Sequence, residues 1–233
     1  MKREVIVTAD GSSTIHIPEW NEQYHSKHGA IQEAYHVFIK HGLSYILEID
    51  SKKRLENNIC ILEIGFGTGL NAFITLLESE KHNLNINYTG VEAFPVALEE
   101  VAQLNYVQQL KAEVKLTEFT KLHEVSWEKN QVVSNTFSII KQQKKFADIR
   151  DVNIYNLIYF DAFGARVQPE LWTEDMFKIM YDALKNNGVL VTYAAKGSVR
   201  RAMQAVGFLV EKLPGPPGKR EMLRATKVLE PDL

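Results

Sequence analysis

The sequence of 233 residues predicts an α/β fold in which helices cover both faces of a mainly parallel β-sheet. Three observations carry this prediction. Short apolar runs alternate with segments whose apolar side chains recur at helical spacing, the pattern of successive strand–helix–strand units. A cluster of glycines follows the first apolar run of the core, at a strand-to-helix turn. The composition, 45% hydrophobic and 24% charged, is that of a globular protein with a substantial core.

We expect a single domain, 1–233, made of an N-terminal extension over residues 1–50 and a core over 51–233. In the extension, alternating apolar residues flank an Asp-Gly-Ser turn at 10–12, which predicts a β-hairpin. Apolar side chains at helical spacing then predict a helix over 29–48.

The core continues with strands and helices in alternation. The predicted strands cover 59–64, 87–91, 154–160 and 188–193, and a closing strand pair covers 208–213 and 224–229. The predicted helices cover 71–77, 96–110, 173–185 and 198–206. Ligands of such sheets bind beyond the carboxyl ends of the strands. We therefore expect the functional residues directly after these strands.

The first predicted strand runs into a loop of alternating glycines, Gly65, Gly67 and Gly69, that opens a helix in the run ILEIGFGTGLN. Glycines there let the backbone turn sharply and bring its N–H groups close to a ligand at the helix N-terminus. The dinucleotide-binding fingerprint needs a small residue where Leu70 stands, and the Gly-Lys-Ser/Thr of a P-loop is absent. The loop therefore indicates another nucleotide-like cofactor.

Glu92 follows the second predicted strand, 23 residues after Gly69. An acidic residue at that spacing can accept hydrogen bonds from both hydroxyls of a ribose. The alternative is an ordinary surface acid after a strand, and the glycine loop upstream favours the cofactor role.

Asp161 ends the third predicted strand, between Phe160 and Phe163. Aromatic neighbours would form a dry wall that strengthens polar interactions made there. An amine nucleophile has to be neutral when it attacks, and a nearby carboxylate can orient it and accept its proton. The alternative role for Asp161 is to cap the turn or helix that follows.

The C-terminal part of the chain is basic, although the net charge is −2. Residues 196–227 hold eight basic and two acidic side chains, a local charge of +6, which leaves −8 elsewhere. Such an end can bind a polyanion, or it can be an ordinary solvated face. Trp172 and Tyr193 could stack on a base, and Trp172 could equally belong to the core.

The sequence also excludes some classes. The single cysteine, Cys60, rules out an internal disulfide and lies in an apolar run, as in core positions of cytosolic proteins. No apolar run approaches the roughly 20 residues that span a bilayer, and no signal-type stretch follows the charged start. We therefore expect a cytoplasmic protein without a membrane partner.

Six segments together resemble a known family. They are NEQYHSKHGAIQEAYHVFI (21–39), EIGFGTGLN (63–71), VEAFP (91–95), YFDAFGARVQPELWT (159–173), TYAAKGSVRRAMQAVGF (192–208) and PGPPGKREML (214–223). Over almost the whole chain, this set is similar to the tRNA 5-aminomethyl-2-thiouridine methyltransferase family, the methyltransferase half of bifunctional MnmC-type enzymes. The DAF…PELW and KGxVRR…GF…KREM segments are the most specific.

The resemblance implies a Rossmann-like class I methyltransferase sheet that binds S-adenosyl-L-methionine, no metal, and a tRNA as partner. The methyl group would go to the aminomethyl nitrogen of the wobble uridine in the anticodon loop, with Asp161 as the catalytic acidic residue. The implied cofactor-binding residues are Tyr24, Glu33, Glu63, Gly65, Gly67, Thr68, Gly69, Asn71 and Glu92. The implied substrate- and tRNA-binding residues are Phe163, Tyr193, Lys196, Arg200, Arg201, Lys219 and Arg220. Segment 24–33 would close over the cofactor.

The chain departs from the family pattern in two places. The bifunctional relatives carry an additional FAD-dependent domain, which we do not expect within 233 residues. Relatives also show a Gly-Asp pair before the fourth strand that reaches the adenine, whereas residues 138–151 have none. Asp148 is a candidate substitute without an assigned role.

Three alternative functions remain at this stage. A spermidine-synthase-type aminopropyltransferase would carry a GGGDG-like loop and an acidic substrate side, whereas this chain has EIGFGTG and a basic side. A small-molecule amine N-methyltransferase would lack tRNA affinity. A catalytically silent RNA-binding module is disfavoured by the intact glycines together with Glu92 and Asp161.

Overall fold

The structure is a computed structural model that describes residues 2–50 and 58–228. Its main sheet has eight strands in the order β10-β11-β9-β8-β4-β5-β7-β6. The strands are β4 (Asn58–Ile64), β5 (Asn85–Val91), β6 (Gln131–Ser134), β7 (Phe137–Gln142), β8 (Tyr155–Phe160), β9 (Leu184–Thr192), β10 (Phe208–Pro214) and β11 (Glu221–Lys227). Strands β7, β5, β4, β8 and β9 run parallel, whereas β6, β10 and β11 pair antiparallel with their neighbours. The expected α/β class is confirmed.

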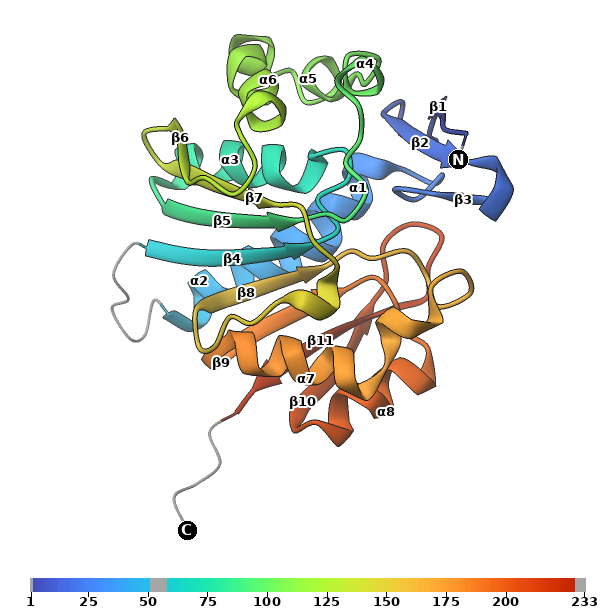
Figure 1. Cartoon of the computed structure of the whole chain (residues 1–233), viewed down its shortest axis with the longest axis vertical. Helices are drawn as coiled ribbons and strands as arrows, with labels where there is room; N and C mark the ends of the chain where they lie inside the picture. The colour runs from blue at the N-terminus through green and yellow to red at the C-terminus, as the bar shows by residue number, and fades with distance from the viewer. Residues whose placement is uncertain (1, 51–57, 229–233) are drawn as a thin grey trace.

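Both faces of the sheet are covered, which is why its central strands β4 and β8 are mainly apolar (Figure 1). One face packs against α3 (Leu70–His82) and against three consecutive helices of the N-terminal part. These are α1 (Ala30–Ala34), the π-helix η2 (Tyr35–Ser44) and α2 (Tyr45–Asp50). The other face packs against α7 (Glu174–Ala183) and α8 (Gly197–Ala205). Adjacent residues of β4 divide between the two cores: Ile61 packs with Phe38 and Phe73, and Leu62 with Phe177.

The N-terminal extension forms a three-stranded antiparallel sheet at the carboxyl ends of β4, β5 and β8 (Figure 1). Its elements are β1 (Glu4–Val7), β2 (Ser13–Ile17), the 3₁₀ helix η1 (Pro18–Trp20) and β3 (Glu22–Gln23). The predicted hairpin is confirmed, because Val7 pairs with Ser13 across a turn in which Gly11 has a φ of +84°. Strand β3 was not expected.

The continuous helix predicted over 96–110 is wrong. The structure has two single-turn helices there, α4 (Leu98–Val101) and α5 (Tyr106–Gln109). Asn105 lies between them and bonds to the hairpin instead of continuing the helix. Its side chain accepts a hydrogen bond from the Ser13 N–H at 2.7 Å and donates one to the Gly11 carbonyl at 2.9 Å. Tertiary bonds to the extension therefore override the apolar spacing.

The other predicted strands and helices are present with shifted boundaries, although Leu229 of the last strand lies outside the described residues. Helix α7 begins after Thr173, whose hydroxyl accepts the Met176 N–H at 3.4 Å. Several further elements were not predicted: α6 (Leu116–Glu124), β6, β7 and the 3₁₀ helices η3 (Glu113–Lys115), η4 (Phe146–Asp148) and η5 (Pro169–Trp172). Among the described residues, none of the helices is both long and apolar enough to cross a membrane.

Candidate active site

A cavity of about 1610 Å³ lies beyond the carboxyl ends of β4, β5, β8 and β9, beneath the N-terminal extension. Its walls are the glycine loop, the loops that follow β5, β7, β8 and β9, and the β10–β11 loop. Pockets for one small molecule commonly measure roughly 300–1,000 Å³. The cavity is therefore large enough for a nucleoside-sized cofactor together with a second group of similar size.

The glycine loop needs its glycines for conformation and for space. Gly65, Gly67 and Gly69 have φ values of +88°, +49° and +71°. A Cβ on Gly65 would lie 2.8 Å from the main-chain oxygen of Asp161, and one on Gly67 would lie 2.9 Å from the Tyr24 ring. The loop therefore forms a cradle in which backbone, rather than side chain, faces a ligand.

Glu92 joins the glycine loop to the end of β5. Its carboxylate is 9% exposed and accepts the Gly67 N–H at 3.1 Å and the Phe94 N–H at 2.9 Å. A carboxylate offers about four acceptor positions, so two remain for other donors. This arrangement fits a pair of ribose hydroxyls.

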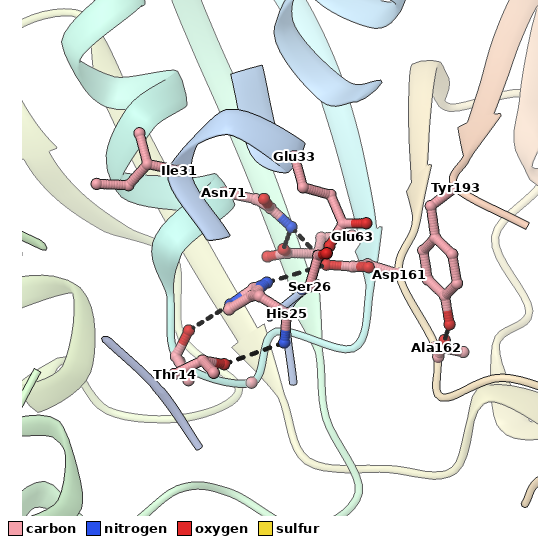
Figure 2. Close-up of polar contacts among 12 residues, drawn as sticks. Thr14, His25, Ser26, Ile31, Glu33, Glu63, Asn71, Asp161, Ala162 and Tyr193 are labelled. Atoms are coloured by element: carbon pink, nitrogen blue, oxygen red, sulfur yellow. Dashed lines mark hydrogen bonds and ion pairs between the residues drawn. The ribbon is translucent and has the colours of Figure 1, made fainter. Parts of the chain in front are cut away.

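Asp161 and Glu63 are two acidic side chains held by one amide (Figure 2). The Asn71 Nδ2 group donates to Asp161 Oδ2 at 2.8 Å and to Glu63 Oε1 at 2.9 Å. Glu63 is 1% exposed, and its burial raises its pKa well above the ordinary value, with the nearby Asp161 charge adding to the effect. Glu63 thus favours its protonated form, while Asp161 faces the cavity.

The pKa of the Asp161 carboxyl lies near neutrality. Burial raises its pKa to about 7, and the negative charge of Glu33 contributes in the same direction. The Asn71 hydrogen bond and the positive charge of Lys219 oppose the rise. A carboxyl with a pKa near neutrality can accept a proton and release it at working pH.

An ion pair closes one side of the cavity. Glu33, buried on α1, accepts the Ser26 N–H at 2.8 Å and pairs with the Lys219 ammonium from the β10–β11 loop. That ammonium lies 3.7 Å from the centroid of the Tyr193 ring, and the Tyr193 hydroxyl donates to the Ala162 carbonyl at 2.8 Å. The two partners of the ion pair are 186 residues apart in the sequence, so this contact joins the N-terminal extension to the end of the core.

Aromatic rings and one guanidinium form the outer wall. The Phe163 ring packs edge-on against Trp20 and Tyr24, with centroid distances of 5.5 Å and 5.0 Å. Arg166 donates to the Trp20 carbonyl at 2.6 Å and to Glu22 Oε1 at 2.8 Å. These contacts hold the loop after β8 against the extension, with the aromatic rings forming an apolar part of the wall and the Arg166–Glu22 pair a charged part.

Most of the expected site residues line the cavity. They are Tyr24, Glu33, Gly65, Gly67, Glu92, Asp161, Phe163, Tyr193, Lys196, Lys219 and Arg220. Glu63, Thr68 and Asn71 are buried next to the cavity rather than in its lining, and Gly69 begins α3. Arg200 is half-buried on α8 and Arg201 is exposed there. Trp172, 6% exposed, packs in the core against Phe160 and also borders the cavity, so neither of its two predicted roles is excluded.

The basic C-terminal part is partly neutralised within the fold. Lys212 pairs with Glu221 at 3.0 Å and Arg224 with Glu211 at 2.9 Å. Lys227, 8% exposed, donates to the Leu184 carbonyl at 2.8 Å. Lys196, Arg201 and Arg220 form no ion pair within residues 2–50 and 58–228. These three exposed side chains therefore carry positive charge that is not neutralised within the described residues, and Lys27 and Lys145 add exposed positive charge in the cavity lining.

Two parts of the site were missed by sequence reasoning. His25 is buried beside Asp161, and no spacing rule relates two residues so far apart in the chain. Lys145, Phe146 and Ala147 line the cavity after β7, a strand that was not predicted. Asp148, the candidate substitute for the missing Gly-Asp pair, is not in the lining.

Residues 102–228 match a family model described as S-adenosyl-L-methionine-dependent methyltransferase. Curated relatives include the tRNA 5-methylaminomethyl-2-thiouridine biosynthesis bifunctional protein MnmC of Leptospira borgpetersenii serovar Hardjo-bovis (strain JB197), 26% identical over 224 residues, which cover 88% of this chain and 32% of the relative. The protein of the same name from Hydrogenovibrio crunogenus is 28% identical over 212 residues, 87% of this chain and 31% of the relative. The chain thus spans about a third of the length of these relatives.

Solved structures share the fold. MNMC2 from Aquifex aeolicus superposes with a TM-score of 0.74 at 24% identity and covers 100% of this chain and 73% of that one. Spermidine synthase from Thermotoga maritima gives a TM-score of 0.53 at 15% identity over 94% of this chain and 70% of that one. These superpositions and the family model confirm the expected Rossmann-like methyltransferase sheet.

Proposed function

This chain belongs to the S-adenosyl-L-methionine-dependent methyltransferase family, and from that premise we propose that it methylates the aminomethyl nitrogen of 5-aminomethyl(-2-thio)uridine at the wobble position of tRNA. The observation that carries the proposal is the buried Asp161 carboxyl, whose pKa is about 7, in the same cavity as the glycine loop. The names of the curated relatives, which refer to tRNA 5-methylaminomethyl-2-thiouridine biosynthesis, support this substrate.

The residues present fit the cofactor. When bound, S-adenosyl-L-methionine supplies an electrophilic methyl group on its sulfonium. In our proposal, the Gly65–Gly67 turn, which leaves no room for a Cβ, holds the methionine part of the cofactor. The remaining lone pairs of Glu92 accept hydrogen bonds from the ribose hydroxyls. The Tyr24 ring, which belongs to the N-terminal extension, covers the glycine loop.

Asp161 acts on the substrate amine. An aminomethyl group is largely an ammonium ion at neutral pH, so one proton has to leave before the nitrogen lone pair can form a bond to carbon. The Asp161 carboxylate accepts that proton, and Asn71 holds the accepting carboxylate in one orientation. Glu33 adds negative charge beside Asp161, which favours entry of a cationic amine.

The tRNA side of the proposal rests on charge and space. Lys196, Arg201 and Arg220 lie at or near the rim of the cavity with exposed side chains, where they can contact backbone phosphates. Arg200 lies beside Arg201 on α8, and Lys219 stays paired with Glu33. The cavity volume of about 1610 Å³ accommodates a base turned out of the anticodon loop next to a bound cofactor.

The test is methyl transfer from labelled S-adenosylmethionine to bulk tRNA that has received the aminomethyl group but lacks the methyl group. The tRNA is then digested and its nucleosides are separated by mass. We expect the label in methylaminomethyl uridine. Label in another nucleoside, or transfer only to free small amines, would contradict the proposed substrate.

A further inference from the structure

We propose that His25 is a positioning residue that presents an N–H group to the Asp161 carboxylate and favours its ionised, proton-accepting form. The inference deepens the proposed function and rests on it for the kinetic consequence alone.

His25 is fixed in place from several sides (Figure 2). It follows β3, is 8% exposed, and packs edge-on against the Tyr106 ring with a centroid distance of 6.4 Å. Its main-chain N–H donates to the Thr14 hydroxyl at 3.1 Å. The imidazole therefore lies between Thr68 on one side and Asp161 on the other.

The hydrogen bonds around Thr68 assign the tautomer. The Tyr106 hydroxyl donates to Thr68 Oγ1 at 3.0 Å, and Thr68 Oγ1 lies 2.7 Å from His25 Nε2. With Tyr106 as donor, Thr68 keeps its own hydroxyl hydrogen to donate, and our proposal takes Nε2 as its acceptor. Burial lowers the pKa of His25 to about 4, so the ring is neutral at pH 7 and carries its one hydrogen on Nδ1.

That Nδ1–H group is directed at Asp161. Nδ1 lies 3.9 Å from Asp161 Oδ2, the oxygen that Asn71 already contacts at 2.8 Å. This separation is longer than a hydrogen bond, and in our proposal the contact shortens when substrate is present, as catalytic hydrogen bonds often do. A donor at this position stabilises the charged carboxylate more than the neutral acid, so it favours ionisation.

Other groups around Asp161 act on the same equilibrium. They are Glu33, Glu63, Lys219, Asn71 and the tyrosines Tyr88, Tyr106 and Tyr193. Glu33 opposes ionisation, whereas Lys219 and Asn71 favour it. Lys219 reaches the site from a loop and is 30% exposed, whereas His25 is buried in the extension. His25, like Asn71, is therefore a buried donor that does not depend on movement of the β10–β11 loop.

The first test measures the Asp161 pKa in the ligand-free protein by carbon-detected NMR of labelled aspartate, with Asp161→Asn for assignment. His25→Leu should raise that pKa by about one unit, a tenfold change in the ionisation constant, because a donor to the carboxylate is lost. His25→Gln keeps an N–H donor and should stay closer to the wild-type value. An unchanged Asp161 pKa in His25→Leu overturns the proposal.

A second pair of variants keeps the test valid if His25→Leu does not fold. Tyr106→Phe removes only the hydroxyl that orients Thr68, so the Asp161 pKa should rise, by less than in His25→Leu. Tyr159→Phe is the matched control, because Tyr159 is equally buried and its hydroxyl contacts Thr75 instead. If Tyr106→Phe shifts the Asp161 pKa no more than Tyr159→Phe, the proposal is wrong.

The kinetic test is the pH profile of methyl transfer. In His25→Leu the acidic limb should move upward by about one pH unit, in parallel with the Asp161 pKa. A shifted carboxyl pKa without any methylation of tRNA would support the role of His25 and contradict the proposed substrate. Methylation of tRNA with an unmoved profile and an unmoved carboxyl pKa would contradict the role of His25 alone.

Discussion

Asp161 occupies a place where a negative charge is costly to the fold. Its carboxyl is buried, and the negative charge of Glu33 acts on it. Its hydrogen-bond donor Asn71 is shared with Glu63. Local arrangements that oppose stability in this way are expected where a side chain is retained for its chemistry.

The first prediction concerns the stability of Asp161→Asn. The Asp161 pKa is about 7 in the folded protein and 3.8 in the unfolded chain. Folding therefore favours the protonated carboxyl, and the free energy of unfolding falls as the pH rises from about 4 to about 7. An amide carries no such cost. We expect the free energy of unfolding of the variant, measured by urea unfolding, to exceed that of the wild type by about 2 kcal/mol at about pH 8 and by much less near pH 4. A stability difference that does not change with pH would contradict the raised pKa of the buried Asp161 carboxyl.

The second prediction concerns the glycine loop. Gly67→Val places a branched side chain against the Tyr24 ring at a residue with a φ of +49°, so the loop has to change shape. We expect cofactor affinity to fall by at least about tenfold, roughly 1.4 kcal/mol, in calorimetric titration. Gly197→Ala is the control, because its Cβ meets only the flexible end of Arg201 at 3.2 Å. Equal affinities in the two variants would count against the cradle.

At the scale of elements, the central strands β4 and β8 could be predicted because several consecutive residues in each are apolar. Strands β4 and β8 are buried on both faces, so each contains an unbroken apolar run, residues 59–62 in β4 and 157–160 in β8. Strand β7 was not predicted because it contains Lys141, a charged residue that is nevertheless buried, at 1% exposure. The Lys141 ammonium bonds to the His123 carbonyl and faces the Trp127 ring at 4.8 Å. Such long-range partners cannot be inferred from local spacing, so the strand resembles a surface segment.

The third prediction concerns the break between α4 and α5. Asn105→Ala removes the two side-chain hydrogen bonds that join this break to Gly11 and Ser13 of the hairpin. We expect a loss of about 2 kcal/mol in the free energy of unfolding. Gln103→Ala is the control, because it removes one exposed bond to the neighbouring Glu99 carbonyl. A loss no larger than the control's would mean that the hairpin does not depend on Asn105.

At the scale of the whole molecule, the site joins the N-terminal extension to the sheet. The glycine loop, Glu92 and Asp161 could be predicted because each follows a recognisable strand, and parallel strands bring their carboxyl ends together. The pairing of Glu33 with Lys219 and the approach of His25 to Asp161 could not. Those contacts depend on how the extension packs over the sheet edge, which no local pattern encodes.

The fourth prediction concerns the charge distribution. Arg201→Ala together with Arg220→Ala should weaken tRNA binding and reduce the slope of log affinity against log salt by about 1–2. The matched control replaces Lys121 and Lys129, two exposed lysines of the α6 region that do not line the cavity. Fluorescence titrations at several salt concentrations measure both pairs. Equal slopes would show that the phosphates are held elsewhere.

The measurement that tests the central claim most directly is single-turnover methylation of purified tRNA carrying 5-aminomethyl-2-thiouridine, by wild type and Asp161→Asn. We predict one methyl group per tRNA, on the aminomethyl nitrogen, at a rate that rises with pH through about 7 in the wild type. Asp161→Asn should be slower by about 100-fold or more with cofactor affinity retained. A near-normal rate in the variant, or no transfer to this tRNA by a wild-type protein that binds the cofactor, would contradict the account.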